Sequence, residues 1–175
     1  TIEQIKKFCK SNNLPIPLFV VIQSGTKVLE MENVGSFDTP VRMSNEIPVE
    51  IQLPKVIEIC HKHDVLMKEH NCDYLSDESL EWHPRLGIHA SNVAPEFGVE
   101  ESKALFKILS ENNLNTIKEE ILKISYESRK WEKWMKKDSL KTDEEKSILC
   151  AHYVFSNPQV KILKEKARKE LELKS

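Results

Sequence analysis

Apolar residues in the first 25 positions change from the spacing of a helix to that of a strand. In residues 1–13, TIEQIKKFCKSNN, the side chains of Ile2, Ile5 and Phe8 recur at helical intervals, and the pattern stops at an asparagine pair. Residues 18–25, LFVVIQSG, form a continuous apolar run rich in β-branched side chains. Such a run is typical of a strand buried on both faces in a parallel sheet. We therefore expect a helix followed by a buried strand.

A loop and a second helix are expected next. Residues 26–48 contain turn-forming residues and two prolines, which predicts a long loop with room for some strand. Residues 49–64 predict a helix whose apolar face carries Val56, Ile57 and Cys60. Proline fits best in the first turn of a helix, so Pro54 predicts that this helix begins late.

Two further strands are predicted on either side of a short helix. The apolar runs within residues 65–71 and 85–92 have the length of short strands. Between them, residues 76–84 predict one or two helical turns, with Ser76 as the N-cap and Pro84 just past the end.

The resulting order of elements is that of successive βαβ units. Residues 101–113 complete it with an amphipathic helix, whose apolar face is Ala104, Leu105, Ile108 and Leu109. Such units imply a parallel sheet with right-handed crossovers. A closed eight-stranded α/β barrel takes roughly 250 residues. Residues 1–113, with about three strands, are therefore expected to form at most the second half of such a barrel.

The pattern after residue 113 contains no strand-like run. Residues 114–138 predict a helix with Ile117, Ile121, Ile124 and Trp131 facing inward. Thr142 and Glu145 have the spacing of a capping box for a further helix, and Pro158 can start the last one. We therefore expect residues 114–175 to form a helical extension packed on the partial barrel.

Composition excludes several classes of protein. Apolar residues make up 39% and charged residues 31% of the chain, and the net charge is −2, so neither a nucleic-acid partner nor a membrane is expected. The four cysteines form no CxxC pair, which favours reduced structural thiols in the cytoplasm. The chain begins at Thr1 and not at Met, which favours a processed, trimmed or fragmentary chain.

Polar side chains gather where the predicted strands end. Gln23 and Ser24 end the first strand, residues 68–71 (Lys-Glu-His-Asn) the second, and residues 89–92 the third, with Glu96 close behind. Ligands of α/β folds bind beyond the carboxyl ends of strands, which predicts a shared pocket. Side chains alternate along a strand, so Glu69 and Asn71 should face away from Lys68 and His70. Surface charges at a strand end are the alternative interpretation of Lys68 and Glu69.

Histidines and tryptophans in this sequence also have simpler interpretations. His61 and His63 point in different directions on a helix and are expected to be solvated, while His83 and His152 are expected to be structural. His70 with Asp73, or His89 with Glu96, could hold a divalent cation such as zinc, although no tight ligand motif is present. Trp131 and Trp134 favour core packing over a cofactor site.

An ordered series of segments gives the chain a resemblance to a known family. KEHNCDYLSDESL, EESKALFKIL, KWEKWM and HYVFSNPQV, preceded by VVIQSGT and MENVG, resemble the C-terminal half of the tagatose-bisphosphate aldolase Z-type subunits. The resemblance implies an α/β fold, the C-terminal half of a TIM barrel, of the class II aldolase type. Members act with ketose bisphosphates and are usually regarded as accessory partners of a separate catalytic subunit.

The resemblance also implies roles for individual residues. His70, Asp73 and Tyr74 match a family histidine and Asp-Tyr pair, Glu69 matches a less constant position, and Gln23 and Gly25 match a Gln and a Gly. In an aldolase, Glu69 or His70 would be the general acid or base, helped by Asp73, His89 and Asn92. The expected substrate-binding residues are Gln23, Lys68, Asn71, Tyr74, Asn92 and Glu96.

One departure from the family concerns phosphate. HASNVAPEFG replaces a Gly-Pro-x-Leu-Thr-like stretch, and Glu96 would repel a phosphate, so an unphosphorylated sugar is also compatible with the sequence. Three readings therefore stay open. The chain is an aldolase-like protein of sugar or sugar-phosphate metabolism, a non-catalytic partner of an aldolase subunit or of its own copies, or a fragment that exposes strand edges.

Overall fold

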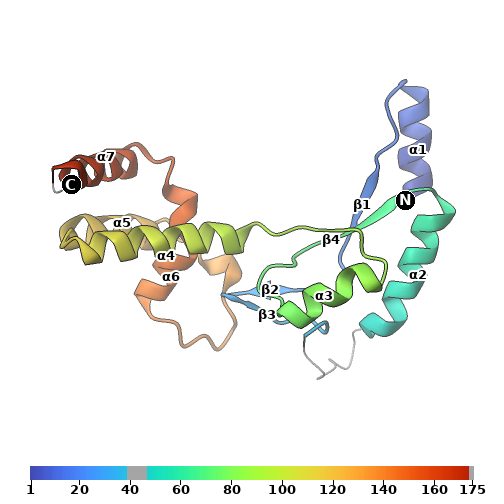
Figure 1. Ribbon diagram of the computed structural model, residues 1–175, viewed down its shortest axis with the longest axis horizontal. Helices are drawn as coiled ribbons and strands as arrows, with labels where there is room; N and C mark the ends of the chain where they lie inside the picture. The colour runs from blue at the N-terminus through green and yellow to red at the C-terminus, as the bar shows by residue number, and fades with distance from the viewer. Residues whose placement is uncertain (39–46, 174–175) are drawn as a thin grey trace. The chain divides into compact units, whose positions relative to one another are not determined.

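The computed structural model describes residues 1–38 and 47–173 as two compact units (Figure 1). The first unit comprises residues 1–28 and 32–93, and the second comprises residues 29–31 and the chain from Ala94 onward. The fold is α/β, as expected, with predominant helix and a small parallel sheet. The described residues form no closed barrel. Helix α4 lies with the second unit, whereas the sequence analysis grouped it with the strands.

The first unit is built on three parallel strands. Its elements along the chain are α1 (Ile2–Ser11), β1 (Phe19–Ile22), α2 (Val49–Lys62), β4 (Leu66–Glu69), α3 (Asp77–Arg85) and β5 (Ala90–Ser91). The strands lie in the order β1-β4-β5, with β4 in the centre and all pairs parallel. Because each pair of neighbouring strands is connected through a helix, the predicted βαβ order is confirmed. The register places Ile22 opposite Glu69, and Glu69 opposite Ser91.

Strand β1 is covered on one face only, so the expected burial on both faces is wrong. Val20 and Ile22 pack against a core formed by Leu53, Cys60, Val65, Met67 and Ile88. Phe19 and Val21, which point the other way, are 37% and 53% exposed. The physical reason is that α2 packs on a single side of the sheet, the side of Met67 (Figure 1).

Two helix boundaries differ from those expected from prolines. Helix α2 begins at Val49 and includes Pro54, because Leu53 is buried in the core and Val49 packs beside it, which fixes the turn before the proline. Pro84 lies inside the last turn of α3 and not past its end. The predicted N-cap of α3 is confirmed, since the hydroxyl of Ser76 accepts a hydrogen bond from the Ser79 amide at 3.2 Å.

The segment expected to be a long loop contains two short strands. β2 (Val28–Leu29) and β3 (Glu32–Asn33) pair with each other in a separate sheet. Two-residue strands are too short for a visible alternation, which explains why the sequence predicts only that some strand is possible here. The remainder of the expected loop includes residues 39–46, which lie outside the described part of the chain.

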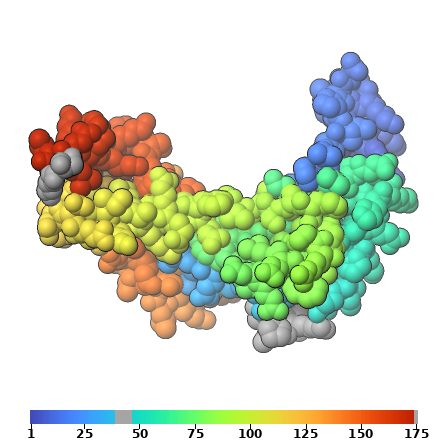
Figure 2. Space-filling view, in the orientation of Figure 1, coloured from blue at the N-terminus to red at the C-terminus, as the bar shows by residue number. Residues whose placement is uncertain are grey.

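Among its described residues from Ala94, the second unit contains helices and no strand, as the sequence predicts. Its elements are α4 (Pro95–Glu111), α5 (Asn115–Glu127), η1 (Glu132–Trp134), α6 (Asp143–Cys150), η2 (Ala151–Val154) and α7 (Pro158–Glu172). Helices α4 and α5 lie side by side as adjacent yellow-green and yellow bands (Figure 2). The core is formed by Phe106, Leu109, Leu114, Ile117, Ile121, Ala151, Val154, Val160, Leu163 and Ala167. The Thr142 to Glu145 capping box and the start at Pro158 are both confirmed.

The segment around the two tryptophans is not one continuous helix. Helix α5 ends at Glu127, and Arg129 adopts a positive φ of 55°, which breaks the helical pattern. The Trp131 ring stacks on Tyr126 with 5.5 Å between the ring centroids, and its Nε1 donates to the Tyr126 carbonyl at 3.0 Å. Trp131 thus packs within its own unit. In the described part of the chain, no helix has the length and apolarity needed to cross a membrane.

Candidate functional site at the carboxyl end of the sheet

Glu69 ends the central strand and is fully buried. Its carboxylate accepts hydrogen bonds from the amide of Ser24 at 2.6 Å, the hydroxyl of Ser24 at 2.5 Å and the hydroxyl of Thr26 at 3.0 Å. The Thr26 hydroxyl also lies 2.5 Å from the His70 carbonyl oxygen, to which it can donate. These contacts tie the segment after β1 to the end of β4.

Burial raises the pKa of Glu69 above its ordinary value, because a carboxylate loses its hydration in the protein interior. The hydrogen bonds from Ser24 and Thr26 and the nearby His70 act in the opposite direction and offset part of this effect. Both carboxylate oxygens already have donors inside the protein. Glu69 is therefore arranged to hold two loops together.

His70 and Asn92 are accessible polar residues that lie next to each other at this end of the sheet. His70 is exposed and Asn92 is half-buried, and the Asn92 side-chain amide donates to Nδ1 of His70 at 3.5 Å. Both are fixed through their backbones. The backbone amide of His70 donates to the backbone carbonyl of Ile22 at 2.8 Å, and the backbone amide of Asn92 donates to the backbone carbonyl of Glu69 at 2.8 Å. The imidazole Nε2 and the amide oxygen can therefore be presented to a ligand from adjacent strand ends.

The predicted alternation along the second strand is confirmed within its bounds. Met67 and Glu69 are buried, whereas Lys68 is half-exposed on the opposite face, level with Val21 and Ala90. The strand ends at Glu69, and Asn71 takes a positive φ of 56°. Lys68 thus lies on the uncovered face of the sheet.

Asn33 connects the loop after β3 with the loop after β4. Its side-chain amide donates to the carbonyl oxygens of Asn71 and Asp73, both at 2.9 Å, and its Oδ1 accepts from the amides of Lys27 and Gly35. Asp73 is buried, and the following Tyr74 is half-buried with a positive φ of 57°. Asp73 and Asn71 thus belong to a loop that is held in one conformation.

Gln23 lines a polar cavity of about 330 Å³ next to the end of β1. The cavity is lined by Gln23, Gly25, Thr26, Lys27, Gly35, Ser36, Ile47 and Gln52. The Gln23 side-chain amide donates to the Thr26 carbonyl at 2.6 Å, which turns the chain back on itself. Gly25 has a φ of +79°, and a Cβ atom there would lie 2.8 Å from Val49, so only glycine fits this turn. Among the described lining residues, Lys27 is the cationic one.

His89 is not brought into this cluster. His89 precedes β5, where its Nδ1 accepts from the Met67 amide at 3.3 Å and its ring lies 6.4 Å from that of His61. His89 is thus the residue immediately before β5. Glu96 lies in the first turn of α4, in the second unit.

The site also contains side chains for which the sequence predicts no binding role, namely Ser24, Thr26, Lys27 and Asn33. Ser24 lies at the end of the predicted strand and Thr26 directly follows it, and this position is the local signal for both. Asn33 donates to a segment about 40 residues away, which no local pattern reveals.

Two results bear on the expected cation and family. Within the described ranges, no group of three or more His, Cys, Asp or Glu side chains is arranged to hold a metal ion. No protein-family model matches the chain, and no curated protein or solved structure matches it significantly.

Proposed function

We propose that the protein is an aldolase-like subunit of sugar or sugar-phosphate metabolism and that the carboxyl end of its parallel sheet binds the sugar. The observation that carries this proposal is the pairing of the accessible His70 with Asn92 above the buried Glu69 network. Imidazole and amide groups on adjacent strand ends are suited to hydrogen bond vicinal hydroxyl groups.

The sheet topology supports the barrel part of this proposal. Three parallel strands follow one another in space in their chain order, with a helix between neighbours, which is the arrangement of consecutive strands in an α/β barrel. The uncovered face with Lys68, Phe19 and Val21 would then face the barrel interior. His70, Asn92 and Lys68 would lie on the substrate side, and Glu69 on the helix side.

Different roles follow for the two neighbouring residues that could act as acid or base. His70 is exposed and can exchange a proton with a sugar hydroxyl, as general acid–base catalysis requires. Glu69 is a positioning residue, because its carboxylate is buried and receives donors from Ser24 and Thr26. Gln23 and Lys27 at the polar cavity would bind more distant hydroxyl or phosphate oxygens of the sugar.

A non-catalytic partner subunit is the second candidate. It is favoured by the burial of Glu69 and Asp73, because two carboxylates that the sequence predicts as catalytic are enclosed by the fold. In that function the same residues would stabilise loops, and the chain would act by supporting a separate aldolase.

Cleavage of tagatose 1,6-bisphosphate, assayed with and without added zinc, distinguishes the two candidates. A catalytic subunit cleaves the sugar, and His70→Ala lowers kcat by 100-fold or more without changing the free energy of unfolding. His63→Ala, at the C-terminal end of α2, is the matched control and should retain activity. Inactivity of the chain alone, with activation of a catalytic aldolase subunit, would favour the partner function. Inactivity in both assays would contradict the proposal.

A further inference from the structure

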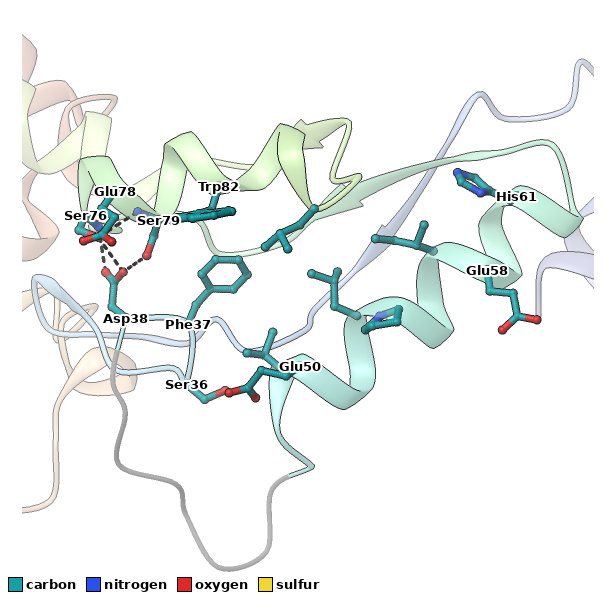
Figure 3. A pocket seen from close by; sticks show the side chains of 15 residues that line it. Ser36, Phe37, Asp38, Glu50, Glu58, His61, Ser76, Glu78, Ser79 and Trp82 are labelled. Atoms are coloured by element: carbon teal, nitrogen blue, oxygen red, sulfur yellow. Dashed lines mark hydrogen bonds between the residues drawn. The ribbon is translucent and has the colours of Figure 1, made fainter.

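A groove of about 970 Å³ separates α2 from α3 on the helix-covered side of the first unit (Figure 3). These two helices do not pack closely against one another within the described part of the chain. The groove is lined by Ser36, Phe37, Asp38, Val49, Glu50, Leu53, Pro54, Ile57, Glu58, His61, Ser76, Glu78, Ser79, Trp82 and Leu86. None of these residues is His70, Asn92 or Glu69, so the groove is distinct from the site at the strand ends.

The groove is elongated along both helices. On α2, its lining includes Val49, Leu53, Ile57 and His61, which recur every four residues. At 1.5 Å per residue, these twelve steps correspond to about 18 Å. On α3, Ser79, Trp82 and Leu86 follow at intervals of three and four residues. The row on α3 covers seven steps, or about 10 Å, so the longer row on α2 sets the length of the groove, which matches a helix of about three turns.

The floor of the groove is apolar and partly aromatic. Phe37 projects between the two helices, and the ring of Trp82 extends from α3 toward the same space (Figure 3). Trp82 is 46% exposed although it is a large aromatic residue. The guanidinium of Arg85 lies 5.2 Å from the centroid of the Trp82 ring, so this ring already attracts a cation.

The described rim of the groove is acidic, although the guanidinium of Arg85 lies beside it at the Trp82 ring. Glu50 and Glu58 lie on α2, and Glu78 lies on α3, and none of the described lining residues is a lysine or an arginine. Asp38 is the fourth carboxylate, and it accepts hydrogen bonds from the amide and hydroxyl of Ser76 and from the hydroxyl of Ser79. Asp38 therefore fixes the start of α3, while Glu50, Glu58 and Glu78 add negative charge to the groove.

From the apolar floor, the length and the acidic rim together, we propose that this groove binds a basic amphipathic helix of a partner protein. Leucine-like side chains at positions i, i+3, i+4 and i+7 of that helix fill the space between Phe37, Leu53 and Trp82. Lysine or arginine side chains on its flanks pair with Glu50, Glu58 and Glu78. The separation of eight positions between Glu50 and Glu58 favours cations about two turns apart on the partner.

The test uses fluorescein-labelled 15-residue peptides and measures their anisotropy with the full chain. The first is an amphipathic Leu/Lys peptide, the second has glutamate in place of lysine, and the third is a scrambled Leu/Lys peptide without helical spacing. We expect saturable binding of the first peptide and at least tenfold weaker binding of the other two. The Trp82→Ala variant should weaken binding at least fivefold, and its helix content is checked by circular dichroism.

A matched charge control separates the groove from general electrostatic attraction. The E50K/E58K/E78K variant should weaken binding at least tenfold, whereas E119K/E120K/E127K, with the same charge change on α5, should weaken it less than threefold. Equal losses in the two variants, or equal binding of the Leu/Glu peptide, would overturn the proposal. Self-association of the chain that Trp82→Ala abolishes, without peptide binding, would assign the groove to a second copy and also overturn it.

Discussion

The amide and the hydroxyl of Ser24 both donate to the carboxylate of Glu69, at 2.6 and 2.5 Å, although the two residues are 45 positions apart. This contact joins the segment after the edge strand β1 to the end of the central strand β4. Because His70 is the next residue, the position of the accessible imidazole depends on how firmly Glu69 is held. The stability of the first unit and the geometry of its candidate site are therefore coupled at Ser24.

Ser24→Ala should destabilise the chain by about 1–3 kcal/mol, because it removes one hydrogen-bond donor from a buried carboxylate. Denaturant unfolding, followed by circular dichroism, measures this change. Ser110→Ala is the control, since Ser110 lies on the exposed side of α4 and should change stability by less than about 0.5 kcal/mol. Equal stabilities of Ser24→Ala and the wild type would contradict the role assigned to Glu69.

His83 should make the chain less stable in mild acid. Burial lowers the pKa of His83, and Asp38 offsets only part of this effect. The unfolded chain therefore binds a proton at a higher pH than the folded chain, so stability is complete above about pH 6.5 and falls as the pH decreases below it. In the wild type, Nδ1 of His83 lies 3.0 Å from the hydroxyl oxygen of Ser91. The variant His83→Asn keeps a polar group toward this hydroxyl.

Unfolding curves at pH 7 and pH 5.5 measure this effect as a difference between wild type and His83→Asn. The comparison cancels the contribution of Glu69, whose raised pKa acts in the opposite direction. We expect the loss of stability between the two pH values to be smaller in the variant, at most by about 1.4 kcal/mol per pH unit. The same pH dependence in both proteins would rule out His83 as the source.

Gly98→Ala should destabilise the second unit, contrary to the usual effect of this change in a helix. A Cβ atom at Gly98 would overlap the ring of His152, and the added methyl group should cost about 1–3 kcal/mol. In the His152→Ala background the space is open, so Gly98→Ala should stabilise the chain by about 0.5–1 kcal/mol. Thermal unfolding of wild type, G98A, H152A and the G98A/H152A double variant measures the effect of Gly98→Ala on stability in the two backgrounds. An effect of the same sign in both backgrounds would contradict the contact between Gly98 and His152.

Asp38→Asn should loosen the start of α3. The hydrogen bonds from Ser79 and Ser76 lower the pKa of Asp38 although burial acts to raise it, so the ionised carboxylate is the form that the fold stabilises. We expect a loss of about 1–2 kcal/mol at pH 7, and the difference from wild type should disappear as the pH falls through the folded pKa of Asp38. Asp64→Asn is the matched control, because Asp64 is exposed and Asn tolerates its positive φ.

Local signals were sufficient for most helices and for the order of the strands. The Thr142 to Glu145 capping box, Pro158 and Ser76 each act within one turn, so their chemistry is readable from neighbouring residues. The late helix start predicted from Pro54 was wrong because the buried Leu53 holds the turn before the proline, and that packing is a tertiary effect. The break after α5 occurs at Arg129, where no proline or glycine in the sequence indicates the end of a helix.

The candidate site was predictable in its location but not in its roles. Strand ends indicated Glu69, His70 and Asn92, and alternation correctly separated Glu69 from Lys68. Which face the helices cover depends on packing across the sheet, and the donors Ser24 and Thr26 come from a different strand end. The sequence therefore could not show that Glu69 is buried while His70 is exposed.

Calorimetric titration of the chain with tagatose 1,6-bisphosphate tests the central claim most directly, since it asks whether the strand ends bind a sugar even where no catalysis occurs. The account predicts saturable binding that the H70A/N92A variant weakens at least tenfold, while Ser110→Ala leaves it unchanged. Absence of binding, or equal binding by H70A/N92A and wild type, would contradict the assignment of the sugar site to His70 and Asn92.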